Sequence, residues 1–357
     1  MFMAETEYDV IILGAGLAGA FAAWELQKHL QVLVIDQPSI IGKGTGVSGG
    51  LINPMMAQKG RRVWEAEAAL DAFKRIADEA HVPRNIIRMD GLFRPAQNPE
   101  QANWFKFSAE TSPHLGVWYD ETVLKAQFPS LDAPFGGIWV HSGGTVKINH
   151  LAKWLISEAN VDHQSVGITA ILEETTGVRI ETKDGDVFSA KVCLSCLGNG
   201  LLNFDPFKGL DLHPVKGQVE VVDPLHVSSD IPSLSGGMYT AIFEDQWICG
   251  SSFRHHYNDL NPSYTDRNLI LSGIRSMISE LPSEIESTSE VGIRITIPGT
   301  RLPMIGPVSD KGNLWVLTGL GSKGLLMAPY LAENLMDWLQ NPHFIPTQLT
   351  IRRHRRQ

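Results

Sequence analysis

Cysteine is scarce in this 357-residue chain, with three residues and no spacing typical of a disulfide framework. Cys193 and Cys196 form a C-x-x-C pair within "KVCLSCLG", but a buried strand there would point their side chains to opposite faces. We therefore interpret both, together with Cys249, as core cysteines of a reducing compartment rather than as a redox or metal pair. The histidines also lack metal-ligand spacing, so no metal is predicted.

Long hydrophobic runs are absent as well. No run approaches the roughly 18 apolar residues of a membrane span. The first residues, "MFMAETEYD", lack the basic and then apolar pattern of a secretory signal, so we expect no membrane span and a cytoplasmic protein. The composition, 43% apolar and 19% charged, is that of a folded protein, and the length favours about two domains.

Basic residues are outnumbered by acidic ones, and the formal net charge is −9. Such a chain repels polyanions on average, which disfavours a nucleic-acid partner without excluding it. The tail "IRRHRRQ" carries four arginines that could contact phosphate, although a solvated terminus is the interpretation we favour.

The clearest motif is "YDVIILGAGLAGAFAAWELQKHLQVLVID" near the N-terminus. It predicts a buried strand, a helix over about residues 17–30 and a second strand, which together form a β-α-β unit. Gly14 permits a tight turn, Gly16 lets the backbone approach a pyrophosphate, and Gly19 allows close packing of the helix on the strand. Asp36 ends the second strand, where a carboxylate typically binds a ribose hydroxyl. The motif therefore predicts a dinucleotide site.

A glycine-rich segment, "IGKGTGVSGGLINP", follows the second strand directly. With five glycines over residues 42–50, we expect no regular element there. Because the segment follows the predicted ribose-binding strand, we favour backbone contact with a flat ligand over a flexible connector. A helix over residues 61–80 is expected to carry the chain away.

A second glycine-rich junction, "WVLTGLGSKGLLMAP", lies near the C-terminus and is expected to join the same sheet. Gly319, Gly321 and Gly324 would turn backbone N–H groups and the positive end of a helix beginning near Leu325 toward developing negative charge, as on a reduced flavin. A terminal helix with a glycine-rich entry is the open alternative.

Seven segments resemble, in order and in approximate spacing, the D-amino-acid oxidase-like FAD-dependent oxidoreductases, the family of glycine oxidase, sarcosine oxidase and D-amino-acid dehydrogenase. They are the N-terminal glycine unit, "GTGVSGGLINP", "GGTVKINHLAKWL", "PVKGQ", "ICGSSFRHH", "VGIR…LPMIG" and "TGLGSKGLLMAP". The similarity spans nearly the whole chain. Within this family, the motifs look most like the flavin domain of the bifunctional enzymes that complete 5-methylaminomethyl-2-thiouridine in tRNA, without their methyltransferase domain.

The resemblance implies an α/β fold, in which a Rossmann-like FAD-binding domain of the glutathione-reductase type carries an inserted substrate domain with a mixed or antiparallel β-sheet. We expect the FAD-binding domain to be discontinuous, over residues 1–80, 142–215 and 290–357. The substrate domain is expected over residues 81–141 and 216–289.

The cofactor implied by the resemblance is non-covalent FAD. Relatives with a cysteine-linked flavin carry that cysteine in the C-terminal part, and this chain has none after Cys249. The isoalloxazine ring is expected along residues 45–51 and against residues 319–324. The expected FAD-binding residues are Gly14, Gly16, Leu17, Ala18, Gly19, Asp36, Gln37, Gly44, Thr45, Gly46, Ser48, Gly49, Gly50, Leu51, Ile168, Cys196, Leu197, Gly198, Gly319, Gly321, Ser322, Lys323, Gly324 and Leu325.

Flavin amine oxidation needs little side-chain catalysis, because a neutral amine can pass a hydride to flavin N5 once its C–H bond is oriented. A substrate carboxylate still requires a buried arginine. The family's arginine before a P-x-x-G turn matches Arg294 in "VGIRITIPGTRLPMIG", but one extra residue intervenes and the acid common there is missing. We prefer Arg294 and keep Arg301 as the alternative; both could instead be surface ion-pair residues.

Further residues are expected on or beside strands that face the flavin, and any of them could orient substrate: Tyr239, Arg254, His255 and His256. A tyrosine or histidine in a sheet is, however, more often a packing or surface residue. Lys43 and Lys323 could activate oxygen or offset flavin charge.

The main function predicted from the sequence is FAD-dependent dehydrogenation of a small or N-substituted amino acid to an imine, which water then hydrolyses. Oxygen or another acceptor would take the electrons. One alternative is a tRNA-modifying oxidase acting on a carboxymethylaminomethyl uridine, which is chemically an N-substituted glycine. The other is a flavin-binding protein without turnover.

Overall fold

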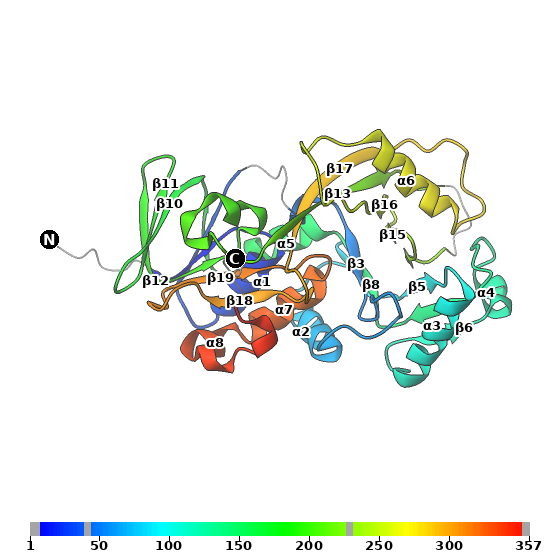
Figure 1. Cartoon of the computed structure of the whole chain (residues 1–357), viewed down its shortest axis with the longest axis horizontal. Helices are drawn as coiled ribbons and strands as arrows, with labels where there is room; N and C mark the ends of the chain where they lie inside the picture. Colours follow the sequence, from blue (N-terminus) through cyan, green and yellow to red (C-terminus); the bar gives the residue numbers. More distant parts are fainter. Residues whose placement is uncertain (1–7, 39–43, 226–230, 352–357) are drawn as a thin grey trace.

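Three β-sheets organise the chain in the computed structural model, which describes residues 8–38, 44–225 and 231–351 (Figure 1). The first sheet has its strands in the order β10-β11-β12-β1-β2-β9, and β19 and β18 extend it beside β12. Its strands are β1 (Tyr8–Leu13), β2 (Val32–Asp36), β9 (Asp162–Ser165), β10 (Ile168–Glu173), β11 (Val178–Thr182), β12 (Val187–Ser195), β18 (Met304–Pro307) and β19 (Leu314–Thr318). β1, β2, β9, β12 and β19 pair in parallel, as expected for a nucleotide-binding sheet.

Helices α1 (Leu17–Leu26) and α7 (Gly324–Glu333) each follow a strand of this sheet and pack against one another. Neither helix is amphipathic, since nine of the ten residues of α1 are buried. A helix buried on all sides fits the apolar, alanine-rich sequence after Gly16. α5 (Ile148–Glu158) also packs on α1, and α8 (Leu335–Gln340) follows α7.

The second sheet is mixed, with the order β17-β13-β16-β15-β14-β5-β7-β6. All its pairs are antiparallel except β14 with β5. Its strands are β5 (Leu92–Pro95), β6 (Val117–Tyr119), β7 (Gly137–Val140), β13 (His213–Val222), β14 (Leu234–Ser235), β15 (Tyr239–Ile242), β16 (Trp247–Gly250) and β17 (Thr288–Thr296). The helices beside it are α3 (Pro99–Thr111), α4 (Glu121–Gln127) and α6 (Tyr264–Arg275). The expected mixed α/β fold class is confirmed.

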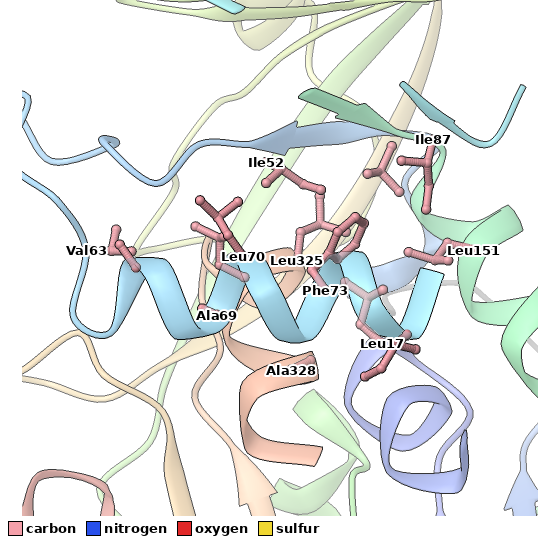
Figure 2. Close-up of a cluster of buried hydrophobic side chains, with 14 of the residues drawn as sticks. Leu17, Ile52, Val63, Ala69, Leu70, Phe73, Ile87, Leu151, Leu325 and Ala328 are labelled. Carbon is pink, nitrogen blue, oxygen red and sulfur yellow. The ribbon is translucent and has the colours of Figure 1, made fainter. Parts of the chain in front are cut away.

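A small third sheet, β3-β8-β4, lies between the two large ones (Figure 1). It consists of β3 (Gly50–Ile52), β4 (Ile87–Arg88) and β8 (Gly144–Val146). The amphipathic helix α2 (Ala66–Glu79) covers it. Figure 2 shows Leu70 and Phe73 of α2 in the same buried cluster as Ile52 of β3. Leu17, the first residue of α1, and Leu325, the second residue of α7, belong to the same cluster. This cluster joins the elements that flank both glycine-rich junctions.

The short 3-10 turns complete the chain: η1 (Gly44–Gly46), η2 (Gly198–Asn203), η3 (Asp205–Phe207), η4 (Pro342–Phe344) and η5 (Thr347–Leu349). The expectation of no regular element over residues 42–50 was wrong for residues 44–46, which form η1, and for Gly50, where β3 begins. β3 forms there because it hydrogen-bonds to β8, nearly one hundred residues away, a partner that local composition cannot reveal.

Two helices are shorter than expected. α1 ends at Leu26 instead of near residue 30, and the chain continues in a turn. α2 begins at Ala66 instead of residue 61, because Glu65 has φ of 51° and a left-handed residue cannot continue a right-handed helix. A short turn between Thr182 and Val187 joins β11 to β12.

We expect Gly19→Ala to destabilise the fold, because a Cβ there would lie 1.8 Å from the carbonyl oxygen of Gly14. The helix would have to move off the strand, at a cost of about 3 kcal/mol in the free energy of unfolding. Urea unfolding measures this change. Gly200→Ala is the control, since its Cβ would meet only Leu197 Cβ at 3.5 Å; equal losses in both variants would contradict the packing explanation.

Candidate functional site

A cavity of about 420 Å³ lies where both glycine-rich junctions meet the second sheet. Its lining comes from the start of α1, from residues 44–51, from β13, β16 and β17, and from residues 317–325. The expected FAD-binding residues that line it are Gly16, Leu17, Ala18, Gly44, Thr45, Gly49, Gly50, Leu51, Cys196, Gly198, Gly319, Gly321, Ser322, Gly324 and Leu325. The structure thus brings together segments some three hundred residues apart in the sequence.

The two junctions approach closely because β1 and β19 flank the same strand. β12 pairs in parallel with β1 on one side and with β19 on the other. The helices that follow therefore start at the same edge of the sheet. A Cβ on Gly324 would lie 3.3 Å from Leu17 Cδ1, so glycine at the start of α7 lets it approach the start of α1.

The first junction has the geometry of an anion-binding turn. Gly14 has φ of 101°, and a Cβ there would lie 2.8 Å from the carbonyl oxygen of Cys196. The backbone N–H of Leu17 donates to Thr45 Oγ1 at 3.1 Å. The Thr45 hydroxyl oxygen thus accepts a hydrogen bond at the positive end of α1, which is the position that a phosphate oxygen favours.

The adenosine end expected at Asp36 lies at the edge of the first sheet. In the parallel pair β2–β9, Asp36 is in register with Ser165. Neither Asp36 nor Gln37 lines the cavity, and Ile168, at the start of β10, does not either. This register was not predicted, because the order of parallel strands is not readable from a local pattern.

The segment of residues 44–51 is held to the second sheet by two sets of hydrogen bonds. Ser48 donates from its backbone N–H to Glu290 Oε2 at 2.6 Å and from its hydroxyl to Glu290 Oε1 at 2.5 Å. Tyr239 donates from its hydroxyl to the carbonyl oxygen of Gly49 at 3.0 Å. A Cβ on Gly49 would lie 2.5 Å from Ile248 Cδ1. Ser48 therefore anchors this segment without lining the cavity, and its partner Glu290 was not foreseen.

Four other expected FAD-binding residues also lie outside the cavity lining. Gly14 and Gly19 shape the first turn, as described above, and Gly46 and Leu197 adjoin residues that line the cavity. Their contribution is to backbone geometry rather than to the cavity surface.

Arg294 on β17 lines the cavity and is largely buried. Its Nη2 donates to Ser251 Oγ at 2.9 Å and to the carbonyl oxygen of Ser252 at 3.3 Å. Its buried Nη1 has no hydrogen-bond partner within the described residues. Burial lowers the pKa of Arg294, and Tyr239 acts in the opposite direction. A buried cation with an unsatisfied donor is suited to an anionic ligand.

Glycine makes room for this side chain. A Cβ on Gly217, in the neighbouring strand β13, would lie 1.9 Å from Arg294 Nη2. The guanidinium therefore occupies volume that a side chain on β13 would otherwise fill. This contact gives the structural reason for the glycine in the "PVKGQ" segment.

Arg301, the alternative anchor, is exposed and outside the cavity lining. Its carbonyl oxygen accepts a hydrogen bond of 2.7 Å from Lys323 Nζ. Burial, and then the charge of Arg301, lowers the pKa of Lys323, which caps α7 beside the cavity lining. Lys43 lies outside the described residues.

Of the other substrate-orienting candidates, only Tyr239 lines the cavity. Burial raises the pKa of its hydroxyl, so it stays a neutral donor. Arg254 pairs with the buried carboxylate of Asp266, and His255 Nδ1 lies 2.8 Å from a ring nitrogen of His213. His256 is exposed and does not line the cavity.

Thr318 and Phe253 are two of the cavity-lining residues that the sequence did not predict. Thr318, at the end of β19, has a buried hydroxyl with no hydrogen-bond partner within the described part of the chain. Phe253 is 57% exposed, and its ring centroid lies 4.3 Å from the Arg294 guanidinium carbon. Together with the bare glycine junctions, an orphaned hydroxyl beside them fits a large polar cofactor.

This arrangement defines the class of protein. The family model described as FAD dependent oxidoreductase matches residues 9–338, and the chain belongs to that family. The protein is therefore an FAD-dependent oxidoreductase, and the expected cofactor and enzyme class are confirmed.

Similar proteins include the tRNA 5-methylaminomethyl-2-thiouridine biosynthesis bifunctional protein MnmC of Idiomarina loihiensis, 27% identical over 97% of this chain and 58% of that protein. The chain thus spans little more than half the length of this relative. The uncharacterized oxidoreductase YurR of Bacillus subtilis is 24% identical over 91% of this chain and 93% of its own.

Among solved structures, glycine oxidase from Geobacillus kaustophilus superimposes with a TM-score of 0.81 at 18% identity, covering 98% of this chain and 99% of the other. Iminodiacetate oxidase from Chelativorans sp. BNC1 also gives 0.81 at 18% identity, covering 96% and 98%. At this identity the likeness establishes the fold.

Two kinds of feature are absent from residues 8–38, 44–225 and 231–351. None of the helices placed there has the length and apolar character needed to cross a bilayer. In those same ranges, no three histidine, cysteine or acidic side chains form a group that could hold a metal ion.

We expect Glu290→Ala to weaken FAD binding, because it removes both hydrogen bonds that anchor Ser48 and the segment beside the cavity. Losing the acceptor of a largely buried N–H costs about 1–3 kcal/mol, or roughly a tenfold rise in the FAD dissociation constant. Titration of the apoprotein with FAD, followed by flavin fluorescence, measures it. The exposed Glu286→Ala is the control; an unchanged constant in Glu290→Ala would contradict the anchoring role.

Proposed function

We propose that the protein dehydrogenates a carboxylate-bearing amine, a small or N-substituted amino acid, to an imine that water hydrolyses. The observation that carries this proposal is Arg294, whose guanidinium lies in the cavity wall with a buried Nη1 that has no hydrogen-bond partner within the described residues. A buried cation without a counter-ion is costly, and a ligand carboxylate relieves that cost.

Arg294 is the better candidate for the carboxylate than Arg301. Arg294 is held by Ser251 and Ser252 inside the cavity, whereas Arg301 is exposed and lies outside the lining. A contact in a water-excluded pocket contributes far more than one at an exposed site.

FAD, when bound, supplies the hydride acceptor for the carbon next to the amine nitrogen. The starts of α1 and α7 would face its charged groups, and the segment of residues 44–51 would lie along it. Tyr239 stays protonated and holds Gly49 in place, so the chain itself contributes positioning rather than proton transfer.

We further propose that FAD is held without a covalent bond. The three cysteines are free and buried, and burial raises the pKa of each thiol, which keeps them unreactive.

We also propose the discontinuous division into an FAD-binding part, residues 1–80, 142–215 and 290–357, and a substrate part. Because β17 crosses residue 290 while pairing with β13, the strand serves both parts.

The names of similar proteins support an amino-acid-like amine. Glycine oxidase and iminodiacetate oxidase share the fold, and iminodiacetate is chemically N-carboxymethylglycine. Both named compounds combine an amine with a carboxylate one carbon away, which is the combination that a single buried arginine beside a flavin can orient.

A second candidate is oxidation of a carboxymethylaminomethyl group on a tRNA uridine, with the same site chemistry. The observation that favours it is the similarity to the tRNA-modifying MnmC proteins, which carry additional sequence beyond the part matched. The net charge of −9 opposes it, and the arginines of the tail lie outside the described residues. A gel shift with bulk tRNA over a salt series tests it; absence of a shift at low salt would exclude this candidate.

The function itself is tested by anaerobic mixing of the FAD-loaded protein with D-amino acids, glycine, sarcosine, proline and N-carboxymethyl amines. We expect at least one carboxylate-bearing amine to bleach the flavin absorbance. If none does while FAD stays bound, the protein is a flavin-binding protein without this activity. The electron acceptor, oxygen or another, is then identified by reoxidising the reduced protein.

We expect Arg294→Ala to raise the apparent dissociation constant of the reducing amine by about 30-fold to 5,000-fold, because a charge-assisted contact in a buried pocket is worth about 2–5 kcal/mol. Anaerobic flavin reduction over a range of amine concentrations measures it, with the flavin spectrum confirming that FAD is retained. Arg301→Ala is the matched control. A larger effect in Arg301→Ala would move the carboxylate contact to that residue.

A further inference from the structure

Phe253 is a partly exposed aromatic residue in the wall of the cavity. It follows β16 and is 57% exposed. Single exposed rings are common on protein surfaces, but an exposed ring in a cavity wall is placed to contact a ligand. This ring borders the cavity that holds the proposed carboxylate anchor.

The backbone on both sides of Phe253 is fixed. Ser252 donates its N–H to the carbonyl oxygen of Gln218 at 3.1 Å, and Arg254 and Lys216 exchange two backbone hydrogen bonds of 2.8 and 3.0 Å. Because Phe253 lies between these fastened neighbours, its ring is presented at a defined position beside β13. Rigid presentation lowers the entropy cost of binding a ligand against it.

Arg294 supports the ring from within the protein. The guanidinium carbon lies 4.3 Å from the ring centroid, a cation–π arrangement. Since one part of the ring covers the cation and more than half of the residue is still exposed, the remaining ring surface is available at the cavity.

The turn of residues 235–238 also lines the cavity, and its two central residues are glycines. A Cβ on Gly236 would lie 2.4 Å from Met277 Sδ, so a larger residue is excluded there by packing. Gly236 and Gly237 therefore add no side-chain volume to the cavity.

We propose that Phe253 is a specificity-determining residue, on which a flat ring carried by the carboxylate-bearing substrate stacks while Arg294 holds the carboxylate. This inference rests on the proposed function and narrows its substrate class to amines or amino acids with an aromatic or heteroaromatic ring a few bonds from the carboxylate. Aromatic pairs prefer offset or edge-to-face geometries and add to simple burial of apolar area.

The test compares phenylacetate with cyclohexylacetate as ligands of the FAD-loaded protein, followed by the change in flavin absorbance. The two acids have the same carboxylate and a similar apolar volume, but only phenylacetate is flat. We expect phenylacetate to bind about three- to tenfold more tightly to the wild type. Phe253→Leu should remove this preference and Phe253→Trp should keep it. Phe107→Leu, at an exposed ring on α3, is the control and should leave the preference unchanged.

Two results would overturn the inference. One is equal affinity of the wild type for the two acids. The other is a Phe253→Leu variant that loses affinity for both acids by the same factor, which would mean that Phe253 only positions Arg294.

Turnover separates this inference from the proposed function. N-benzylglycine should reduce the flavin more efficiently than N-(cyclohexylmethyl)glycine in the wild type, and Phe253→Leu should equalise the two. If no amine reduces the flavin, the proposed function fails, and the ratio of the two acid affinities alone decides the role of Phe253. If amines reduce it without any preference for the flat ring, the inference fails and the proposed function stands.

Discussion

The structure depends on the parallel pairing of β12 with both β1 and β19. This pairing ends two distant strands at one edge of the first sheet and starts α1 and α7 beside one another. The positive ends of α1 and α7 and the two glycine-lined turns then meet at one place. Neither helix with its turn could form a site alone. Packing at that point leaves no room for a side chain at Gly19, and a Cβ at Gly324 would make a tight contact with Leu17. The cofactor site is therefore a consequence of sheet order as much as of the glycine motifs.

Glycines at two positions, Gly217 and Gly49, allow close packing at the second sheet. Gly217 vacates the volume that the Arg294 guanidinium fills, and Gly49 lies against Ile248. A charged group thus reaches the cavity from β17, the strand at one end of the second sheet, which pairs with β13. Its cation is stabilised on one edge by Ser251 and on its face by Phe253, which leaves Nη1 for a ligand. The proposed carboxylate contact would satisfy this donor.

The cofactor and substrate sites share supporting contacts. Residues 44–51 are bonded through Ser48 to Glu290 of β17 and through Gly49 to Tyr239 of β15. β17 also carries Arg294, so one strand holds both the segment along the cofactor site and the proposed substrate anchor. A shift of the second sheet would change both at once, which explains why polar contacts fix the strand at several points.

The sequence by itself determined the features set by neighbours in the chain: the first β-α-β unit, the two glycine junctions, the family, and Arg294 as the preferred anchor. It failed where the partner is remote. The strand β3, the register of Asp36 with Ser165, the Glu290 contact and the stacking of Phe253 on Arg294 all arise from pairings between separate segments. Arg254 and His256 lie outside the cavity lining, although they follow a strand end that reaches it. Only tertiary structure decided these points, because strand order and side-chain direction at an irregular strand end depend on hydrogen bonds and packing that no local pattern encodes.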